Sequence, residues 1–335
     1  MLYFIRRGDL MKVVYMFEPH KAGLEILKNH GINFVFYPGR EASRPWLEKE
    51  IGDASVLVVA PWNKVDKSLI ELGKMLKLIF VHGSGLDKVD VSEATRRGIL
   101  VANAPDFIAE SVADHILALI LAHYRNIVRG DKYIRQRKWT GGTPSDLVGH
   151  VLRGKRVGII GLGRIGAAVA RRLKPFGAEV YYWDRKVKPE MEHALEISRL
   201  NIDQLIETSD IIVVSVALTP ETQGLINKER IYRIKKGALL VNAARGQIVD
   251  EEALIERLRQ GEIYAALDVF KEEPLPPNSP LIELDNVILT PHIGGLSWEA
   301  LEETSKFVAE AIVKYIKEGQ LPATVVNKEL ASLSW

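Results

Sequence analysis

A glycine-rich turn between two strand-like runs constrains the fold of this chain more than any other feature. The turn is Gly161-Leu162-Gly163-Arg164-Ile165-Gly166, and it follows the apolar run 156–160, which is typical of a buried parallel strand. A helical pattern over about 165–176 comes next, and then a second strand over 179–183 that ends at Asp184. Parallel strands need a crossover of this kind, so the segment predicts a βαβ unit of a doubly wound sheet.

The residues of this unit also predict its ligand. The glycines permit a tight turn, and they let a pyrophosphate approach the backbone N–H groups at a helix N-terminus, whose dipole favours an anion. Asp184 stands where a carboxylate can accept hydrogen bonds from both hydroxyls of an adenosine ribose. Glycine turns alone occur by chance, but strand, glycines, helix, strand and terminal acid in this order predict a dinucleotide site.

Composition excludes several classes of protein. The 335 residues suffice for two domains with separate cores, and 47% hydrophobic with 26% charged residues argues against disorder. A net charge of +2 gives no reason to expect nucleic acid or a membrane surface as a partner. The absence of cysteine excludes disulfides, thiolate metal sites and a cysteine nucleophile, and it is compatible with a cytoplasmic protein. The eight histidines lack metal-ligand spacing, so no metal is expected.

No targeting signal is expected from the residues at the N-terminus. The apolar run 2–5 is far too short for the core of a signal peptide, and no run approaches the length of a membrane span. The first strand is expected just after Met11. Residues 1–10 are therefore either an extension, or translation begins at Met11.

Strand-like runs alternate with helical patterns along the chain, which predicts two doubly wound parallel α/β domains of the Rossmann or flavodoxin kind. A long apolar helix over about 109–129 separates two sets of strands, and a helix over 298–317 precedes a strand-like segment, 321–327, that could return to the first set. We predict a dinucleotide-binding domain of residues 109–297, inserted in a substrate domain of residues 1–108 and 298–335, with a cleft between them. The expected strands cover 13–17, 33–37, 56–60, 78–81, 99–101, 157–160, 180–183, 211–216, 238–241, 264–267 and 287–289.

Polar residues follow three of the later strands. Arg245, Asp268 and His292 each come just after a predicted strand, and ligands of such sheets bind where the strands end. A guanidinium can hold a carboxylate by two parallel hydrogen bonds, and a histidine can pass a proton near neutral pH. A carboxylate beside the histidine can raise its pKa, and the adjacent acids Glu272 and Glu273 offer one. Together with a hydride carrier, these groups suit the interconversion of a 2-hydroxy acid and a 2-keto acid.

With these motifs in hand, the chain resembles the D-isomer-specific 2-hydroxyacid dehydrogenases over nearly its whole length. The motifs that carry the resemblance are the glycine turn, 83–87 (Gly-Ser-Gly-Leu-Asp), 218–222 (Leu-Thr-Pro-Glu-Thr), 242–246 (Asn-Ala-Ala-Arg-Gly) and 291–295 (Pro-His-Ile-Gly-Gly). The resemblance implies Arg245, Glu273 and His292 as the catalytic set, the last two acting as a pair. It also implies a homodimer formed through the cofactor domain.

The resemblance further implies a role for each site residue. Arg245 would bind the carboxylate of a keto acid and polarise its carbonyl, with the N–H groups around Ser84 and Gly85 on the other carboxylate oxygen. His292 would donate the proton, and Glu273 would orient the imidazole. The cofactor contacts implied are Gly161, Leu162, Gly163, Arg164, Ile165, Gly166, Asp184, Arg185, Lys186, Thr222, Ala243, Ala244, Arg245, Asp268, His292 and Gly294.

The sequence leaves three choices open. Asp184 favours NAD, whereas Arg185 and Lys186 could stabilise the 2′-phosphate of NADP. Phosphoglycerate dehydrogenases of this family often carry an arginine shortly before the substrate loop, where this chain has 80–82 (Phe-Val-His), so glyoxylate or hydroxypyruvate is favoured. His82 keeps D-3-phosphoglycerate as an alternative. A nucleotide-sensing binding protein on the same fold is the other alternative.

His82, His115 and His123 have no partner visible in the sequence and are interpreted as structural. Trp139 is either a core residue or, as in some relatives of the family it resembles, a residue that reaches the active site of a partner subunit.

Overall fold

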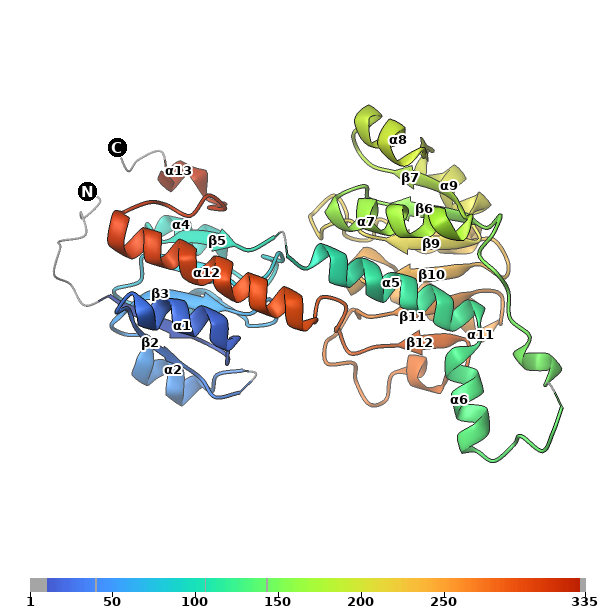
Figure 1. Cartoon of the computed structure of the whole chain (residues 1–335), viewed down its shortest axis with the longest axis horizontal. Coiled ribbons are helices and arrows are strands. Elements are labelled where there is room, and N and C mark those ends of the chain that lie inside the picture. The colour runs from blue at the N-terminus through green and yellow to red at the C-terminus, as the bar shows by residue number, and fades with distance from the viewer. Residues whose placement is uncertain (1–10, 40, 106, 143, 332–335) are drawn as a thin grey trace. The chain divides into compact units, whose positions relative to one another are not determined.

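The structure is a computed structural model that describes residues 11–39, 41–105, 107–142 and 144–331. The chain divides into two compact units, one assigned residues 1–108 and 297–335 (unit 1) and the other residues 109–296 (unit 2). Each unit is a parallel sheet covered by helices on both faces, so the predicted doubly wound α/β class is confirmed (Figure 1). The choice between Met1 and Met11 as the first residue concerns residues 1–10, which lie outside those described.

Unit 1 contains a five-stranded parallel sheet in the order β2-β1-β3-β4-β5, which is the flavodoxin-like order. The strands over 54–59 and 78–81 are buried along their whole length because helices cover both faces of the sheet. The strands are β1 (Lys12–Tyr15), β2 (Asn33–Phe36), β3 (Ala54–Val59), β4 (Leu78–Val81) and β5 (Leu100–Asn103).

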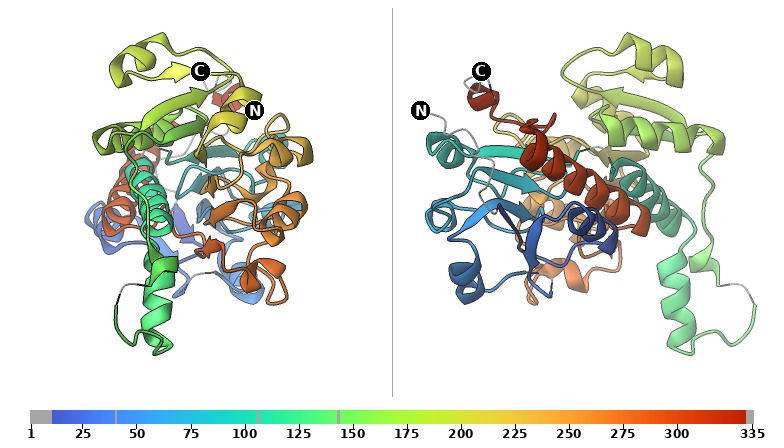
Figure 2. Two further views of the ribbon diagram at one scale, coloured as in Figure 1. Left: turned by 90° about the vertical axis from the view of Figure 1, so that its right-hand side faces the viewer. Right: turned by 60° about the vertical axis from the view of Figure 1, so that its left-hand side comes forward.

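The helices of unit 1 build a core on each face of this sheet. On one face α1 (Lys21–Asn29) packs along α12 (Trp298–Glu318), as Figure 2 shows, and Leu27 shares a cluster with Val308 and Ile312. The other face is covered by α2 (Arg44–Glu50), α3 (Lys67–Ile70) and α4 (Val91–Arg96). Helix α13 (Lys328–Ala331) ends the described chain. Helix α3 ends at Ile70, and the chain then continues as turns toward β4.

The segment 321–327 does return to unit 1, although not as a strand. Val325 forms a single antiparallel bridge with Ala102, and its own N–H donates to the carbonyl of Pro322, which turns the backbone away from an extended path. Asn327 then replaces the backbone partner, because its Oδ1 accepts from the N–H of Val101 at 2.9 Å. The strand predicted there is therefore wrong, while its return to the first sheet is confirmed.

Unit 2 contains a seven-stranded parallel sheet in the order β12-β11-β10-β9-β6-β7-β8, and the chain reverses its direction of winding between β6 and β9. Ligands of such sheets bind at this switch point. The two-residue strand β8 was missed because both of its residues are exposed and polar. The strands are β6 (Arg156–Ile160), β7 (Glu179–Trp183), β8 (Ser198–Arg199), β9 (Ile211–Val214), β10 (Leu239–Asn242), β11 (Tyr264–Leu267) and β12 (Val287–Leu289).

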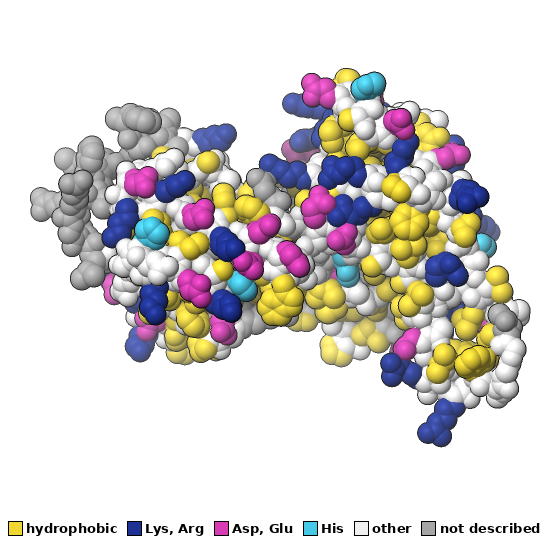
Figure 3. All heavy atoms as spheres, in the orientation of Figure 1, with side chains coloured by type: hydrophobic (Ala, Val, Ile, Leu, Met, Phe, Trp, Pro, Cys, Tyr) yellow, Lys and Arg dark blue, Asp and Glu magenta, His cyan; other side chains and the backbone are white. Residues whose placement is uncertain are grey.

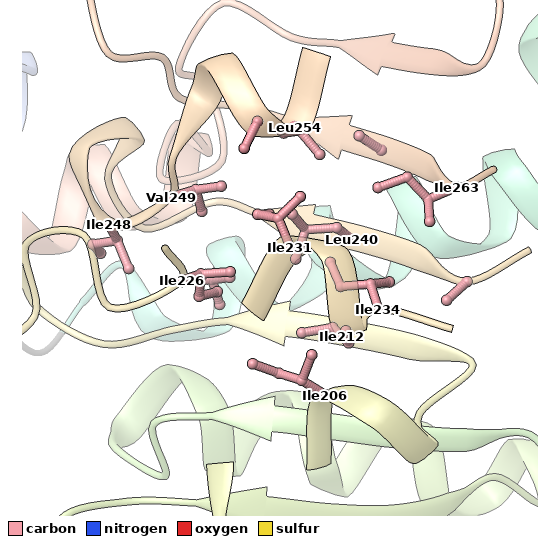
Figure 4. Close-up of a cluster of buried hydrophobic side chains, with 14 of the residues drawn as sticks. Ile206, Ile212, Ile226, Ile231, Ile234, Leu240, Ile248, Val249, Leu254 and Ile263 are labelled. Carbon is pink, nitrogen blue, oxygen red and sulfur yellow. The ribbon is translucent and has the colours of Figure 1, made fainter. Parts of the chain in front are cut away.

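A dense aliphatic cluster fixes the helices of unit 2 against its sheet. Leu240 of β10 and Ile212 of β9 are fully buried, and Ile206, Ile231 and Leu254 reach them from three helices (Figure 4). The helices of unit 2 are α5 (Ala109–Tyr124), α6 (Ile127–Arg135), α7 (Arg164–Leu173), α8 (Pro189–Leu195), α9 (Ile202–Thr208), α10 (Lys228–Arg233) and α11 (Glu251–Arg259), with 3₁₀ turns η1 (Ser145–Leu147), η2 (Lys174–Phe176), η3 (Gly246–Ile248) and η4 (Pro280–Glu283).

The single helix predicted over 109–129 is wrong, because the structure breaks it into α5 and α6. The carbonyl of Tyr124 accepts a hydrogen bond of 2.7 Å from the N–H of His150, and Asn126 has a left-handed backbone with φ of 51°. An α-helix cannot continue through such a residue. The apolar pattern misled the prediction because Ile127 and Val128 continue it beyond the break.

Within the residues described, none of the helices combines the length and the apolar character that crossing a membrane requires.

Candidate active site

Three polar residues follow adjacent strands of the unit 2 sheet. Asp268 comes directly after β11, Arg245 follows β10, and His292 follows β12; the three strands are neighbours and run parallel. Their carboxyl ends therefore share one edge of the sheet, as predicted.

His292 and Glu273 form a pair at this edge. Nδ1 of His292 lies 2.7 Å from Oε2 of Glu273, and Oε1 of Glu273 accepts a hydrogen bond of 3.1 Å from the N–H of Phe270. Burial alone would raise the pKa of Glu273, but the hydrogen bond with His292, that from Phe270 and the nearby charge of Arg245 hold it below its ordinary value. Glu273 is thus an ionised carboxylate that fixes the ring of His292. Among the described residues no hydrogen-bond partner is found for Nε2 of that ring.

The backbone around His292 is held by a buried carboxylate. His292 has a left-handed backbone with φ of 52°, and the two N–H groups that follow it, of Ile293 and Gly294, donate to Oδ1 and Oδ2 of Asp268 at 2.9 and 2.8 Å. Asp268 is 1% exposed. Burial would raise the pKa of Asp268, but donors from His115, Thr290 and these N–H groups keep it below its ordinary value.

Two more side chains complete the environment of Asp268. The hydroxyl of Thr290 donates to Oδ1 at 2.6 Å, and Nε2 of His115 lies 3.3 Å from the same oxygen and 3.1 Å from Oγ1 of Thr290. His115 belongs to α5, far away in the sequence. Sequence analysis therefore missed its place at this site, since no local pattern links it to Asp268.

Arg245 stands on a turn that the neighbouring loop supports. Asn242, 1% exposed, donates from Nδ2 to the carbonyl of Arg245 at 3.0 Å and accepts from the N–H of Ala244 at 3.1 Å. A Cβ on Gly246 would lie 2.0 Å from the carbonyl carbon of Phe270, so the two backbones touch where only glycine fits. The turn of Arg245 is thereby packed on the loop that leads to Glu273.

The glycine turn fits the phosphates of a dinucleotide. Gly161 has φ of 101°, and a Cβ on Gly166 would lie 2.1 Å from the carbonyl oxygen of Gly161, so these two positions require glycine for the turn and for its packing. Gly163, which precedes α7, has open space where a Cβ would stand. A pyrophosphate can therefore approach the N-terminus of α7 at Gly163.

Two internal contacts fix the orientation of Asp184. Its Oδ2 accepts from the N–H of Leu162 at 3.0 Å and lies 3.2 Å from Nζ of Lys188, which also donates to the carbonyl of Leu162 at 2.6 Å. Burial would raise the pKa of Asp184, but these groups and the N–H of Lys186 hold it below its ordinary value. Among the described residues, Oδ1 has only that long 3.4 Å contact with the N–H of Lys186, so it has room to accept hydrogen bonds from the hydroxyls of a ligand.

The other predicted cofactor residues lie on several segments of unit 2. Arg185 and Lys186 are exposed beside Asp184, and Arg164 and Ile165 open α7. Ala243, Ala244 and Gly294 lie on the loops after β10 and β12. Thr222 differs from the rest, because its hydroxyl is already engaged: it donates to the carbonyl of Ala217 at 2.6 Å and accepts from the N–H of Thr219 at 2.8 Å. Thr222 thus stabilises the conformation of the loop after β9.

The predicted substrate loop lies in unit 1, directly after β4. Ser84 and Gly85 are half-buried, and the carbonyl of Ser84 accepts a hydrogen bond of 3.0 Å from Nδ2 of Asn103. The preceding His82 is buried, with Nε2 2.8 Å from Oγ of Ser305 and its ring against Phe17. Burial lowers the pKa of His82 to about 4, so it is neutral and offers no charge to a phosphate.

Trp139 is not a core residue. Its side chain is 61% exposed, and its indole N–H donates to the carbonyl of Gly142 at 3.0 Å. Core packing, one of the two interpretations, is therefore wrong. In the ranges that the structure describes, no group of three or more acidic, histidine or cysteine residues could hold a metal ion.

Comparisons with known proteins agree with this geometry. The family model described as the NAD binding domain of D-isomer specific 2-hydroxyacid dehydrogenases matches residues 117–294. The glyoxylate reductase of Pyrococcus furiosus is 40% identical over 93% of this chain and 94% of that protein. The TT0316 protein from Thermus thermophilus, known from a crystal structure, is 37% identical with a TM-score of 0.87. The match covers 94% of this chain and 100% of the TT0316 chain. A NADPH-dependent glyoxylate/hydroxypyruvate reductase from Sinorhizobium meliloti, solved with NADP and malonate, has 30% identity and a TM-score of 0.82 over 96% of this chain and 98% of its own. The chain belongs to the D-isomer specific 2-hydroxyacid dehydrogenase family.

Proposed function

We propose that this protein is a reductase that transfers a hydride between a nicotinamide nucleotide and a small 2-keto acid, glyoxylate or hydroxypyruvate. The observation that carries the proposal is the 2.7 Å contact between His292 and Glu273, beside Arg245 on one edge of the sheet. A proton donor with a fixed orientation and a guanidinium are the groups that such a reduction needs from the protein. The 40% identity to a glyoxylate reductase supports the choice of substrate.

Each residue has a separate task in this proposal. Arg245 binds the substrate carboxylate and polarises the carbonyl, and the N–H groups around Ser84 and Gly85 take the other carboxylate oxygen. The bound nicotinamide supplies the hydride. His292 gives the proton of Nε2 to the carbonyl oxygen as negative charge develops there. Glu273 holds the opposite nitrogen of the ring, so that Nε2 faces the substrate.

The substrate loop favours an unphosphorylated acid. No arginine precedes it over 80–82, and the only basic side chain there, His82, is buried and neutral. D-3-phosphoglycerate therefore has no cation on this segment of unit 1 to bind its phosphate. It remains the alternative substrate, to be tested directly.

The cofactor site is expected to prefer NAD and to admit NADP. The open Oδ1 of Asp184 suits the ribose hydroxyls of NAD. Lys188 offsets the charge of this carboxylate, and Arg185 and Lys186 are exposed beside it, which supports use of NADP as well. We propose the cytoplasm as the compartment, with which the lack of cysteine is compatible.

We propose that a second copy of this chain covers the apolar arm of unit 2, which consists of α6 and the described residues that follow it as far as Val151. None of the residues of α6 is buried, although a surface helix normally buries an apolar stripe. Figure 3 shows several hydrophobic side chains on the surface of this region. Exposed apolar side chains that gather in one region of a surface are typical of an interface, and a homodimer is the simplest one. The exposed large hydrophobic residues of this arm are Ile127, Val128, Ile134, Trp139, Val148 and Val151.

The proposed reaction is tested by following NADH and NADPH absorbance with glyoxylate, hydroxypyruvate, pyruvate and phosphohydroxypyruvate. We expect the first two to give the highest kcat/KM. In His292→Ala, kcat should fall by about 10²- to 10⁴-fold, the usual contribution of general acid catalysis. His193→Ala, which removes an exposed histidine of α8, is the control and should keep kcat. Preference for phosphohydroxypyruvate would favour the phosphoglycerate alternative, and nucleotide-dependent oligomerisation with negligible turnover would favour a sensor.

A further inference from the structure

His115 has a polar environment that its place in the sequence does not reveal. It lies in the apolar helix α5, yet its Nε2 is 3.1 Å from Oγ1 of Thr290 and 3.3 Å from Oδ1 of Asp268. Both partners stand at the ends of strands that carry the active site. No step of the proposed reaction uses His115, so its polar contacts require another explanation.

The direction of each hydrogen bond in this group follows from the chemistry of its members. The carboxylate of Asp268 only accepts, so the single hydroxyl proton of Thr290 points to Oδ1, 2.6 Å away. Oγ1 of Thr290 then has only acceptor positions left for His115. Nε2 of His115 must therefore carry a proton and donate it toward Thr290 and Asp268.

This chain of bonds ends at the catalytic histidine. Asp268 receives the N–H groups of Ile293 and Gly294, the two residues that follow His292. The left-handed backbone of His292 is a strained conformation, which persists only when its surroundings hold it. A Cβ on Gly294 would stand 3.3 Å from Cδ2 of His115, so the ring also lies against this turn.

We propose that His115 is a positioning residue for His292. It holds Thr290 and Asp268 in one arrangement, and Asp268 in turn holds the 292–294 turn so that the imidazole meets the substrate correctly. Without the donor, the 1% exposed Asp268 loses one of its partners, and buried carboxylates depend on such partners. The inference rests on the proposed role of His292 as the proton donor.

The test compares variants of two histidines on the same helix. His115→Phe keeps a ring but removes the donor, and His115→Gln keeps an N–H donor. His123→Phe is the matched control, because the His123 ring also lies in α5 but packs on Tyr264, with centroids 4.5 Å apart. For each variant, kcat and KM for glyoxylate, the Kd of NADH and the melting temperature are measured.

We expect His115→Phe to lower kcat by about 10- to 100-fold, because a misplacement of about 1 Å in a catalytic group costs this much. KM and the Kd of NADH should stay within about twofold, since His115 touches neither ligand in this scheme. His115→Gln should recover most of kcat. His123→Phe should lower the melting temperature while leaving kcat near that of the wild type.

A second variant keeps the test decisive if His115→Phe does not fold. Thr290→Val removes the hydroxyl that joins His115 to Asp268, and it should lower kcat in the same way. A folded His115→Phe or Thr290→Val protein with the kcat of the wild type overturns the inference. His292→Ala separates the two proposals: if it is inactive while these variants are normal, only the positioning role fails, and if it is active, the proposed function fails.

Discussion

The ammonium of Lys188 lies 3.2 Å from the carboxylate of Asp184 and 2.6 Å from the carbonyl oxygen of Leu162, so the acid expected to bind the ribose carries a fixed counter-charge. An uncompensated carboxylate at this position repels the 2′-phosphate of NADP. The ion pair with Lys188 reduces the repulsion between this carboxylate and a 2′-phosphate.

Cofactor selectivity should therefore change when Lys188 is replaced. In Lys188→Met, we expect the ratio of kcat/KM for NADPH to that for NADH to fall about 5- to 10-fold, which corresponds to about 1 kcal/mol for one partly screened charge. The measurement is steady-state kinetics with both cofactors. Lys314→Met, which removes an exposed lysine of α12 in unit 1, should leave the ratio unchanged. An equal ratio in Lys188→Met and wild type would show that Lys188 does not set selectivity.

Two glycines of the same turn should respond differently to alanine. In Gly166→Ala the new Cβ would meet the carbonyl oxygen of Gly161 at 2.1 Å, so we expect a large loss of stability. In Gly163→Ala the Cβ enters open space and stability should change little, but the methyl group would stand where the pyrophosphate approaches. Melting temperatures and the Kd of NADH by fluorescence distinguish the two effects. Normal NADH binding by Gly163→Ala would contradict the assignment of this turn to the phosphates.

Acid should destabilise the protein partly through His82. Its pKa is about 4 in the folded state and 6.5 in the reference state, so between these values the unfolded chain binds the additional proton. Above pH 6.5 His82 is neutral in both states and does not lower the free energy of unfolding. As the pH falls toward 4, protonation of the unfolded chain lowers the free energy of unfolding, by about 2 kcal/mol at pH 5. His82→Gln keeps a hydrogen bond to Ser305 without titrating. Urea denaturation at pH 7 and pH 5 should show a smaller pH dependence for the variant, and equal dependence would mean that His82 is not buried neutral.

The apolar arm of unit 2 should control association. In Ile134→Glu a charge replaces a side chain that is 58% exposed, and we expect sedimentation analysis to show monomers where the wild type forms dimers. Ile282→Glu is the matched control, since Ile282 is 51% exposed but lies on η4, outside the arm. A monomeric wild type would refute the homodimer, and an Ile134→Glu dimer would place the interface elsewhere.

The sequence predicted those parts of the molecule whose signal is local. Buried parallel strands such as β4 are continuous apolar runs, and the glycine turn has its own spacing, so the sheets, their class and the strand-end positions of Arg245 and His292 could be anticipated. Contacts between residues that are distant in the sequence leave no such pattern. Lys188 and His115 became visible only when the fold brought them to Asp184 and Asp268.

The break between α5 and α6 shows the same limit. It depends on a hydrogen bond from His150 to the carbonyl of Tyr124, and the apolar residues that follow it are consistent with a continued helix. Hydrophobic periodicity indicates which face of a helix is apolar, but it does not reveal that a distant segment donates a hydrogen bond to a carbonyl of the helix. The strand expected over 321–327 failed for a related reason, because the side chain of Asn327 takes the place of a backbone partner.

The contact of Gly246 with the backbone of Phe270 has a consequence for redesign. With a Cβ position 2.0 Å from a carbonyl carbon, the loop that presents the guanidinium and the loop that presents the acid have complementary surfaces at this point. A change in the length or sequence of either loop would therefore change the position of the other. Attempts to alter the range of accepted acids by loop grafting must therefore transfer both loops together, as a single unit.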